Sequence, residues 1–325
     1  MIPIVILIVS LLVVSKSADW FLRSAEKIGV ALGLSPFILG MILVGFGTSL
    51  PEMATSVAAV LDGVNTVTLP NVIGSNLVNV LVTVGVVSFI LGTIRFEKDL
   101  IDIDLPLLAS ATALFIIMAI DGSVTRGEGI VLAIGFISYL LYAMLHREGR
   151  EFHRGLIYVV GSLTRYTKGM AESHRVSKLQ GSWIVTMLLS VGLLAVASKF
   201  AVDSAIDIAR DLNILVDVVS FFAIAIGTSL PELVVSLRAL KQRKGDIALG
   251  NIIGSSVFNL LFVAGIASIL SEQHITGNLL YWMLGGLGLS VLLITTSGIT
   301  KRIYVWEGFM FLLIYIAISM KIIAL

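Results

Sequence analysis

The sequence contains Gly47-Thr48-Ser49-Leu50-Pro51-Glu52, and the same six residues return as Gly227-Thr228-Ser229-Leu230-Pro231-Glu232. A second matched pair follows at the same offset of 180 residues: Asn71-Val72-Ile73-Gly74-Ser75 with Asn79, and Asn251-Ile252-Ile253-Gly254-Ser255 with Asn259. Both copies lie among long apolar runs. A carboxylate beside two hydroxyls and a helix-breaking proline, placed twice in apolar sequence, indicates an internal duplication.

The composition is typical of a membrane protein. The 325 residues are 57% hydrophobic and 13% charged, and the mean hydropathy is +1.03, whereas soluble domains carry roughly 25% charged residues. A soluble core of this length cannot bury so much apolar surface, so we expect a polytopic membrane protein in a lipid bilayer. The absence of cysteine excludes disulfides, thiolate metal sites and cysteine catalysis. The net charge of +1 gives no indication of a nucleic-acid partner.

Apolar runs of about 20 residues predict ten transmembrane helices and an all-α fold. The runs cover residues 2–30, 35–60, 68–93, 103–121, 127–145, 183–209, 214–240, 246–271, 276–297 and 304–324. The first run leads into Lys16, Asp19 and Arg23 and has no small-residue cleavage site, so we expect a span and not a removable signal peptide. The polar stretch 146–182, rich in Arg, Lys and His, separates two halves of five spans, 1–145 and 183–325.

Basic residues predict the orientation of these spans. If the N-terminus is outside, the inside loops hold 17 of the 22 basic residues, which is the distribution that the positive-inside rule requires. The outside loops instead carry acidic residues such as Asp62, Asp121 and Glu272. We therefore expect both termini outside and the 146–182 loop in the cytoplasm.

The two halves are predicted to be inverted relative to each other. An odd number of spans in each half requires opposite orientations, and matched positions also exchange charge: Arg23 and Lys27 align with Asp203 and Asp207. Duplicated halves that insert upside down keep their motifs and reverse the sign of their flanks. The sequence therefore predicts an inverted repeat.

Glu52 and Glu232 lie well inside the second and seventh predicted spans. An ionisable group at membrane depth costs at least a few kcal/mol and is a functional candidate by default. Because the two glutamates occupy the same position of two inverted repeats, a pseudo-two-fold axis can bring them together at the midplane. The alternative is that they are structural acids, paired with each other or protonated.

The residues beside each glutamate supply further oxygen atoms. Thr48 and Glu52 are four residues apart, which places them on one face of a helix. Pro51 lacks the N–H that would bond to the Gly47 carbonyl, so the preceding turn is expected to be strained. Freed carbonyls can coordinate ions where the backbone lines a cavity. The same reasoning applies around Pro231.

The second matched motif adds a hydroxyl and an amide to each half. Ser75 with Asn79 and Ser255 with Asn259 are four residues apart in the third and eighth predicted spans. Carboxylate, hydroxyl, amide and carbonyl oxygens are the ligands that calcium and sodium prefer, and two carboxylates neutralise one divalent or two monovalent ions. Such polar residues also commonly hold membrane helices together, and that interpretation stays open for the serines and asparagines.

The two Gly-Thr-Ser-Leu-Pro-Glu stretches, each followed by Gly-Ser and an Asn four residues later, resemble the alpha-repeats of the cation/calcium exchanger superfamily, near residues 40–80 and 220–260. The chain is most similar to the prokaryotic sodium/calcium exchanger branch over nearly its whole length. The resemblance implies the sodium/calcium exchanger fold, in which the second, third, seventh and eighth spans enclose cation sites and the long first and sixth spans slide to alternate access. It also implies a prokaryotic cell membrane, Ca²⁺ and Na⁺ as transported ions, no organic cofactor and no obligatory protein partner.

The resemblance also implies a set of cation ligands. Carried over by position, these are Glu52 and Glu232, the side-chain oxygens of Thr48, Ser49, Thr228, Ser229, Ser75 and Ser255, the backbone carbonyls of Gly45 and Ala225, and Asn79 and Asn259 in the middle of the site. Many sodium/calcium exchangers and the potassium-dependent branch have an aspartate at the position of Asn259. The neutral residue leaves two carboxylates, which argues against potassium co-transport.

Together these features predict secondary antiport of Na⁺ and Ca²⁺. The two ions are expected to compete for the same carboxylates, and a carrier with two unpaired carboxylates should not cross a hydrophobic barrier empty. The resemblance implies three sodium ions for one calcium ion. Proton-coupled antiport is the nearest alternative, followed by a cation channel and an intramembrane enzyme. An enzyme has little support because the chain has no cysteine, no histidine inside a span and no HExxH motif.

Overall fold

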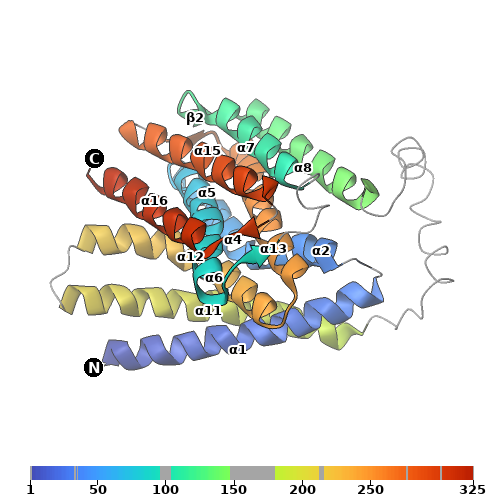
Figure 1. The fold of residues 1–325 in the computed structure, drawn as a ribbon. Helices are drawn as coiled ribbons and strands as arrows, with labels where there is room; N and C mark the ends of the chain where they lie inside the picture. Colours follow the sequence, from blue (N-terminus) through green and yellow to red (C-terminus); the bar gives the residue numbers. More distant parts are fainter. Residues whose placement is uncertain are drawn as a thin grey trace.

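The structure, a computed structural model, describes residues 2–32, 34, 36–95, 104–146, 180–211, 216–275, 277–300 and 302–324. Most of these residues are helical (Figure 1). Each of the ten predicted spans coincides with a helical segment to within two residues at either end. The predicted cytoplasmic loop at 146–182 lies outside the described residues from 147 to 179.

The described elements of the first half are as follows, with π-helical segments labelled η: α1 (Ile2–Ala31), α2 (Pro36–Ile38), η1 (Leu39–Gly45), α3 (Phe46–Thr48), α4 (Leu50–Leu61), α5 (Thr68–Leu77), η2 (Val78–Thr83), α6 (Val84–Leu91), β1 (Ile94–Arg95), α7 (Leu105–Ala119), β2 (Ser123–Val124) and α8 (Arg126–His146). The second half contains α11 (Gly181–Asp211), α12 (Val216–Lys241), α13 (Gly245–Val257), η4 (Phe258–Val263), α14 (Ala264–Leu270), β3 (Gln273–His274), α15 (Asn278–Ile299), β4 (Arg302–Ile303) and α16 (Val305–Ile323).

The length and composition of these helices suit a membrane. Among the described residues, seven helices are long and apolar enough to cross one, and the bent pair Leu39–Thr48 and Leu50–Leu61 brings the number to eight. Helix α7 is apolar but shorter, and α12 contains Pro231. The count of ten spans stays a prediction.

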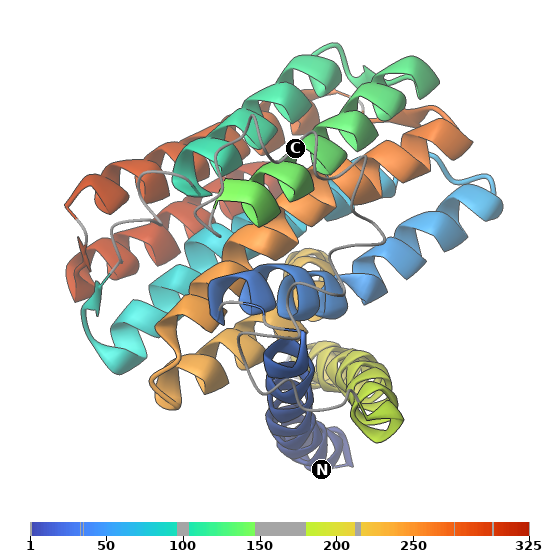
Figure 2. The same cartoon turned by 90° about the vertical axis from the view of Figure 1, so that its right-hand side faces the viewer.

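The helices divide into an enclosed core and a peripheral pair. In an apolar 18-residue stretch of each helix, 83% of the residues are buried inside the protein for Thr68–Ile90 and for Gly245–Leu270, against 22% for α1 and 28% for Gly181–Ala201 of α11. Figures 1 and 2 show α1 and α11 side by side along one edge of the bundle. Their outward faces are apolar, as expected for helices that face lipid.

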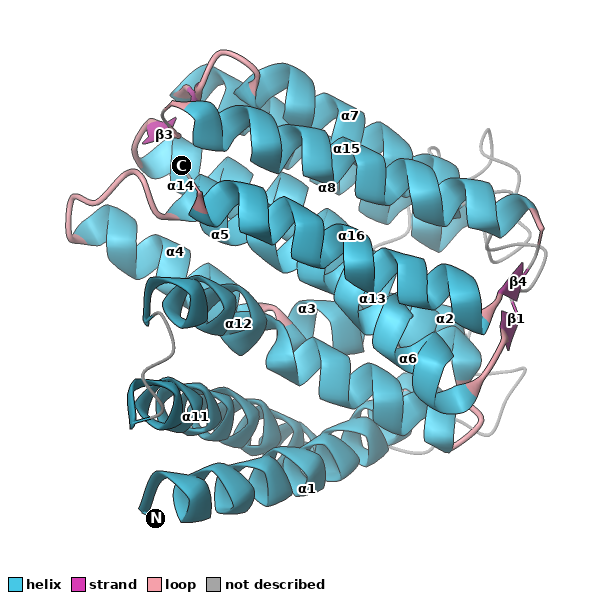
Figure 3. Cartoon of the chain, turned by 60° about the vertical axis from the view of Figure 1, so that its left-hand side comes forward, coloured by secondary structure: helices cyan, strands magenta, loops and turns pink. Residues whose placement is uncertain are grey.

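Two short antiparallel pairings join the ends of the helices. Strand β1 pairs with β4, with Ile94 opposite Ile303, and β2 pairs with β3, with Ser123 opposite His274. The two pairs lie at opposite ends of the bundle (Figure 3). At the 180-residue offset of the motifs, Ile94 corresponds to His274 and Ser123 to Ile303. The two pairings are therefore equivalent, as they would be if a two-fold axis related the halves.

Glycines allow the two halves to interlock near the repeated motifs. A methyl group on Gly40 of η1 would lie 2.4 Å from the Ile247 carbonyl oxygen, and one on Gly254 of α13 would lie 2.4 Å from the Met41 carbonyl oxygen. Only residues without a side chain permit two backbones to approach so closely. This contact places the segment before the first motif directly against the helix of the second Asn-Gly-Ser motif.

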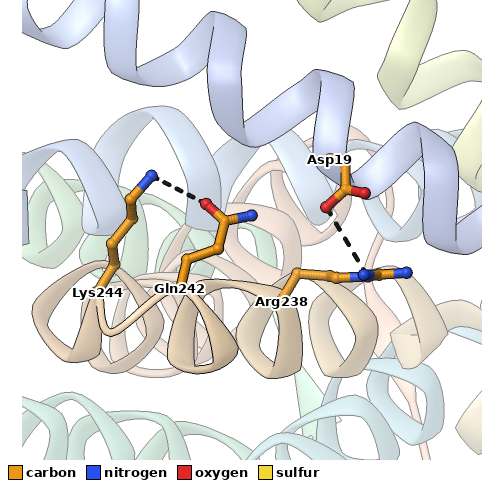
Figure 4. Close-up of polar contacts among 4 residues, drawn as sticks. All are labelled: Asp19, Arg238, Gln242 and Lys244. Atoms are coloured by element: carbon orange, nitrogen blue, oxygen red, sulfur yellow. Dashed lines mark hydrogen bonds and ion pairs between the residues drawn. The ribbon is translucent and has the colours of Figure 1, made fainter.

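Ion pairs connect the peripheral helix α1 to the C-terminal part of α12 and the residues that follow it, and Figure 4 shows the pair between Asp19 and Arg238. The Arg238 Nε atom lies 3.8 Å from Asp19 Oδ1, and Lys244 forms an ion pair with Glu26. Lys244 also donates a hydrogen bond of 2.9 Å to Gln242 Oε1. Charged residues of the first span therefore contact the span that carries the second glutamate.

Candidate functional site

Glu52 and Glu232 are both brought into the enclosed core. Glu52 is in the first turn of α4 and Glu232 is in α12, and each is 0% exposed. Their carboxyl groups are close enough to interact electrostatically. The Ser49 hydroxyl donates a hydrogen bond of 2.9 Å to Glu232 Oε1, so the first motif directly contacts the glutamate of the second. The predicted meeting of the two motifs is found in the structure.

Further candidate residues also pair across the two halves. The hydroxyls of Ser75 and Thr228 lie 3.3 Å apart, and Asn79 Nδ2 donates a 3.1 Å hydrogen bond to Ser255 Oγ. Each of these pairs joins residues more than 150 positions apart in the sequence. These contacts join polar residues of the first half directly to polar residues of the second half.

The first motif breaks its helix, as Pro51 predicts. Helix α3 ends at Thr48, Ser49 has φ −88° and ψ 5°, and α4 begins at Leu50 with its axis bent by 42°. The missing N–H of Pro51 leaves the Gly47 carbonyl without its usual helical donor. The break places Thr48 at the end of α3 and Glu52 in the first turn of α4, and the common face of the two residues stays a prediction.

The second motif behaves differently. Pro231 lies inside α12, which is assigned as one helix from Val216 to Lys241, so a break like that at Pro51 is not found. A proline inside a membrane helix is tolerated when neighbouring groups satisfy the freed backbone atoms. The same six residues thus adopt two conformations in one molecule. Ala225, the counterpart of Gly45, lies within α12.

Two π-helical segments carry the candidate asparagines. Asn79 lies in η2 (Val78–Thr83) and Asn259 in η4 (Phe258–Val263), and the two segments are related by the 180-residue offset. A π-helical turn shifts side chains away from ordinary helical spacing and is frequent at functional sites. The apolar sequence of these segments gives no signal for a π-helix, so the sequence could not predict them.

Several buried polar atoms of the candidate site have no hydrogen-bond partner among the described residues. They are Glu52 Oε1 and Oε2, Glu232 Oε2, Ser229 Oγ, Asn79 Oδ1, and Asn259 Oδ1 and Nδ2. Buried polar groups are almost always paired, and an unpaired buried carboxylate is especially costly. A bound cation would satisfy the oxygens, since carboxylate, hydroxyl and amide oxygens are the ligands of hard cations.

The donor set also limits which metals suit the site. Within the described ranges of the chain, no cluster of three or more His, Cys, Asp or Glu residues could hold a metal ion. The site therefore offers two carboxylates surrounded by neutral oxygen donors, without imidazole or thiolate ligands. This donor set disfavours zinc and copper and suits calcium and sodium.

Asn251 is a site neighbour that the sequence prediction did not include among the candidate residues. Its side chain is 0% exposed. The Nδ2 atom donates hydrogen bonds to the Glu232 carbonyl oxygen at 3.2 Å and to Ser236 Oγ at 2.8 Å, and Oδ1 accepts one from Thr48 Oγ1 at 3.1 Å. The position of Asn251 at the start of a repeated motif was the signal that could have identified it.

Comparison with known proteins gives a consistent result. A family profile described as sodium/calcium exchanger protein matches residues 2–145 and 182–323. The sodium/calcium exchanger MaX1 of Methanosarcina acetivorans is 28% identical over 342 residues, with 96% of both chains covered. The inner membrane protein YrbG of Escherichia coli is 32% identical over 272 residues, covering 83% of this chain and 80% of that protein.

A solved structure of the sodium-calcium exchanger NCX_Mj, soaked with 2.5 mM Na⁺ and 0.1 mM Ca²⁺, superposes with a TM-score of 0.76. It is 26% identical in sequence, and the match covers 98% of this chain and 97% of that one. The family profile, the full-length relatives and the shared fold agree with the apolar helices and the oxygen-rich site. The chain belongs to the sodium/calcium exchanger family and is a multi-pass membrane antiporter that exchanges a cation for calcium.

Proposed function

We propose that the chain exchanges Na⁺ for Ca²⁺ by alternating access, and that both ions bind between Glu52 and Glu232. The observation that carries this proposal is the set of buried carboxylate oxygens that have no donor among the described residues: both oxygens of Glu52 and Oε2 of Glu232. Ser49 supplies only one hydrogen bond to this pair of carboxylates. A cation that replaces the missing partners would offset the cost of burying two negative charges.

The proposed ligands are the residues that the two sequence motifs predict. They are Glu52 and Glu232, the side-chain oxygens of Thr48, Ser49, Thr228, Ser229, Ser75 and Ser255, the carbonyls of Gly45 and Ala225, and Asn79 and Asn259. Two carboxylates neutralise one calcium ion, or two sodium ions with a third held by neutral oxygens. Calcium and sodium therefore compete for the same two carboxylates. A carrier whose carboxylates are unpaired is held back by the cost of moving two charges through an apolar barrier.

The proposed architecture is ten spans arranged as two inverted repeats, residues 1–145 and 183–325, joined by a cytoplasmic loop at 146–182, with both termini outside a prokaryotic cell membrane. The equivalence of the β1–β4 and β2–β3 pairings supports the inverted repeat. Helix contacts support it too. A methyl group on Gly129 of α8 would lie 2.8 Å from the Gly265 carbonyl oxygen in α14, and one on Gly85 of α6 would lie 2.8 Å from the Gly308 carbonyl oxygen in α16.

Alternating access is proposed to depend on α1 and α11. These two helices pack mainly against each other at the edge of the bundle, whereas the helices that carry the site are enclosed. A peripheral pair can slide along an enclosed core without disturbing its packing. Sliding of this pair would open the site first to one side of the membrane and then to the other.

The test is uptake of radiolabelled calcium into proteoliposomes loaded with sodium. We expect sodium-driven uptake in the wild-type protein and background uptake in Glu52→Gln, which removes one of the two charges. Asp62→Asn removes an exposed carboxylate of a loop and is expected to leave uptake unchanged. A second arm of the experiment imposes a pH gradient without sodium. Calcium uptake in that arm alone would show that protons, and not sodium, are the coupling ion. Absence of calcium movement in both arms would contradict the proposal.

A further inference from the structure

We propose that Asn251 is a positioning residue of the cation site, which fixes the main chain at Glu232 and accepts the hydroxyl proton of Thr48 so that Thr48 can present a lone pair to the ion. The inference rests on the proposed cation site at Glu52 and Glu232. It adds a residue that contacts two proposed ligands from opposite halves of the chain and is not a ligand itself.

The chemistry of its neighbours fixes the orientation of the Asn251 amide. The Glu232 carbonyl oxygen, 3.2 Å from Nδ2, can only accept a hydrogen bond, so the NH₂ group must face it. Ser236 Oγ, 2.8 Å away, accepts the second hydrogen. Both amide hydrogens are therefore used, and Oδ1 must point toward Thr48. A flipped amide would place two acceptors against each other in a fully buried position.

Thr48 has one hydroxyl proton and several acceptors. The Asn251 Oδ1 atom lies at 3.1 Å and the Gly45 carbonyl oxygen at 3.2 Å, and the hydroxyl also interacts with the Glu232 carboxylate. A hydroxyl that coordinates a cation turns a lone pair toward it and must donate its proton elsewhere. With an ion bound to Glu232, donation to Asn251 leaves the Gly45 carbonyl free to act as a ligand as well.

The counterpart of Asn251 in the first half lacks these contacts. Asn71 occupies the equivalent position and is 8% exposed, yet its Nδ2 atom has no hydrogen-bond partner in the described part of the chain. Ser56, the counterpart of Ser236, is 0% exposed, and its hydroxyl has no partner among those residues either. Among the described residues, the asparagine in the second half therefore makes these hydrogen bonds and its counterpart in the first half does not. Asn71 and Ser56 are thus matched control positions for Asn251 and Ser236 in the same molecule.

The experiment measures equilibrium binding of radiolabelled calcium to the purified full-length protein. We expect Asn251→Ala to weaken calcium binding by about tenfold or more, because it removes three buried hydrogen bonds. Ser236→Ala, which removes one acceptor and leaves the rest of the chain intact, should weaken binding by about threefold. The matched variants Asn71→Ala and Ser56→Ala should keep a calcium affinity within about twofold of wild type. Asn71 Nδ2 and Ser56 Oγ have no hydrogen-bond partner among the described residues, so these substitutions remove no such bond.

A double-mutant cycle separates positioning from a structural role. If Asn251 acts partly through Thr48, the loss of calcium affinity in the Thr48→Val/Asn251→Ala protein should be smaller than the product of the two single losses, because Thr48→Val already removes one of the three hydrogen bonds of Asn251. Thr48→Ser keeps the hydroxyl, so its combination with Asn251→Ala should show the full loss. If Asn251→Ala does not fold, the comparison of Ser236→Ala with Ser56→Ala decides the question.

Two results would overturn the inference. One is equal calcium affinity in the Ser236→Ala and Ser56→Ala proteins, and the other is an additive effect of Thr48→Val and Asn251→Ala. Either result can be obtained while the wild-type protein binds calcium, so the proposed function would stand. Failure of the wild-type protein to bind calcium would instead remove the site itself.

Discussion

At the residue scale, the two carboxylates of the site differ in their hydrogen bonds although they occupy equivalent positions. Glu232 accepts a hydrogen bond from Ser49, whereas both oxygens of Glu52 lack a donor among the described residues. Both side chains are fully buried. A buried charge without a partner is tolerated only if something else neutralises it. If the proposed cation site is right, Glu52 should depend more on the ion than Glu232 does, because Glu232 already accepts a hydrogen bond.

A third carboxylate at Asn259 should make the protein depend more strongly on calcium. Asn259 is 0% exposed, so Asn259→Asp buries a third negative charge, which the proposed site places beside Glu52 and Glu232. We expect the ion-free protein to lose about 2 kcal/mol or more of unfolding free energy, because like charges repel. Saturating calcium should restore much of this loss, since the ion binds only the folded state. Thermal unfolding with and without calcium measures both effects.

The control for this variant is Asn76→Asp. Asn76 is also buried, but its Nδ2 donates to the Val72 carbonyl oxygen in its own helix, and it is outside the proposed ligand set. We expect a lower unfolding temperature in this protein without a larger calcium-induced rise. If the calcium-induced rise is the same in both variants, Asn259 does not lie beside the ion.

At the scale of the elements, the sequence predicts the helices well because a single physical property determines them. Apolar runs long enough to cross a bilayer coincide with helical segments to within two residues. The break at Pro51 is local and was predicted from the missing N–H. Pro231 has the same six-residue context and remains inside α12, so the outcome at a proline depends on contacts from other helices, which the local sequence does not contain.

The candidate site was predictable where it repeats and not where it depends on packing. Glu52 and Glu232 were identified because a buried carboxylate recurs at a fixed offset. The sequence did not predict the π-helices η2 and η4. It also did not predict the hydrogen bonds of Asn251 to Thr48 and Glu232, because they depend on how the two halves pack against each other. Gly254 illustrates this dependence: a methyl group there would lie 2.4 Å from the Met41 carbonyl oxygen, a contact between the two halves that only the folded chain reveals.

Restoring a backbone N–H at position 51 should damage the site more than the same change at position 231. Pro51→Ala allows the residue to donate to the Gly47 carbonyl, which favours a continuous helix and moves Thr48 relative to Glu52. We expect calcium affinity to fall by about tenfold, because coordination depends on ligand placement. Pro231→Ala acts on a helix that is already continuous and should change affinity by less than about threefold. Calcium titrations of both proteins make the comparison, and equal losses would contradict this account.

The ion pair between α1 and α12 should influence transport rate more than binding. Arg238 and Asp19 are 3.8 Å apart and partly exposed, so the pair contributes about 0–1 kcal/mol to stability. If α1 slides along the core, the pair forms in one access state only, and Arg238→Gln should change the exchange rate by up to about fivefold. Calcium affinity in detergent should stay the same. Initial rates of sodium-driven calcium uptake measure the effect, which salt should weaken in the wild-type protein.

Lys241→Gln is the control for Arg238→Gln, since it removes the same charge from an exposed position of the same helix end. The reversed pair, Asp19→Arg with Arg238→Asp, should recover part of the wild-type rate because it restores opposite charges at the same distance. Equal rates for Arg238→Gln, Lys241→Gln and wild type would show that the pair does not report the position of α1.

At the scale of the whole molecule, the two halves are related in connectivity and differ in conformation. The strand pairings at both ends and the 180-residue offset of the motifs relate them. The halves differ in three features: the first motif bends its helix at Ser49, the second motif lies in the continuous helix α12, and Asn251 bonds to the Glu232 carbonyl oxygen. An inverted repeat whose halves exchange conformations would face the opposite side of the membrane. The observed asymmetry between the halves is therefore consistent with the proposed alternating access.

The charge of the transported ions predicts that exchange depends on the membrane potential. Three sodium ions leaving for each calcium ion that enters would move one net positive charge outward, so an inside-positive potential should increase calcium uptake into sodium-loaded vesicles. One charge crossing the membrane is worth about 2.3 kcal/mol per 100 mV, so the equilibrium accumulation of calcium should rise about tenfold for about 60 mV. Potassium gradients with valinomycin set the potential. Accumulation that does not change with potential would instead indicate electroneutral exchange, in which the two carboxylates carry two sodium ions or one calcium ion and no further charge.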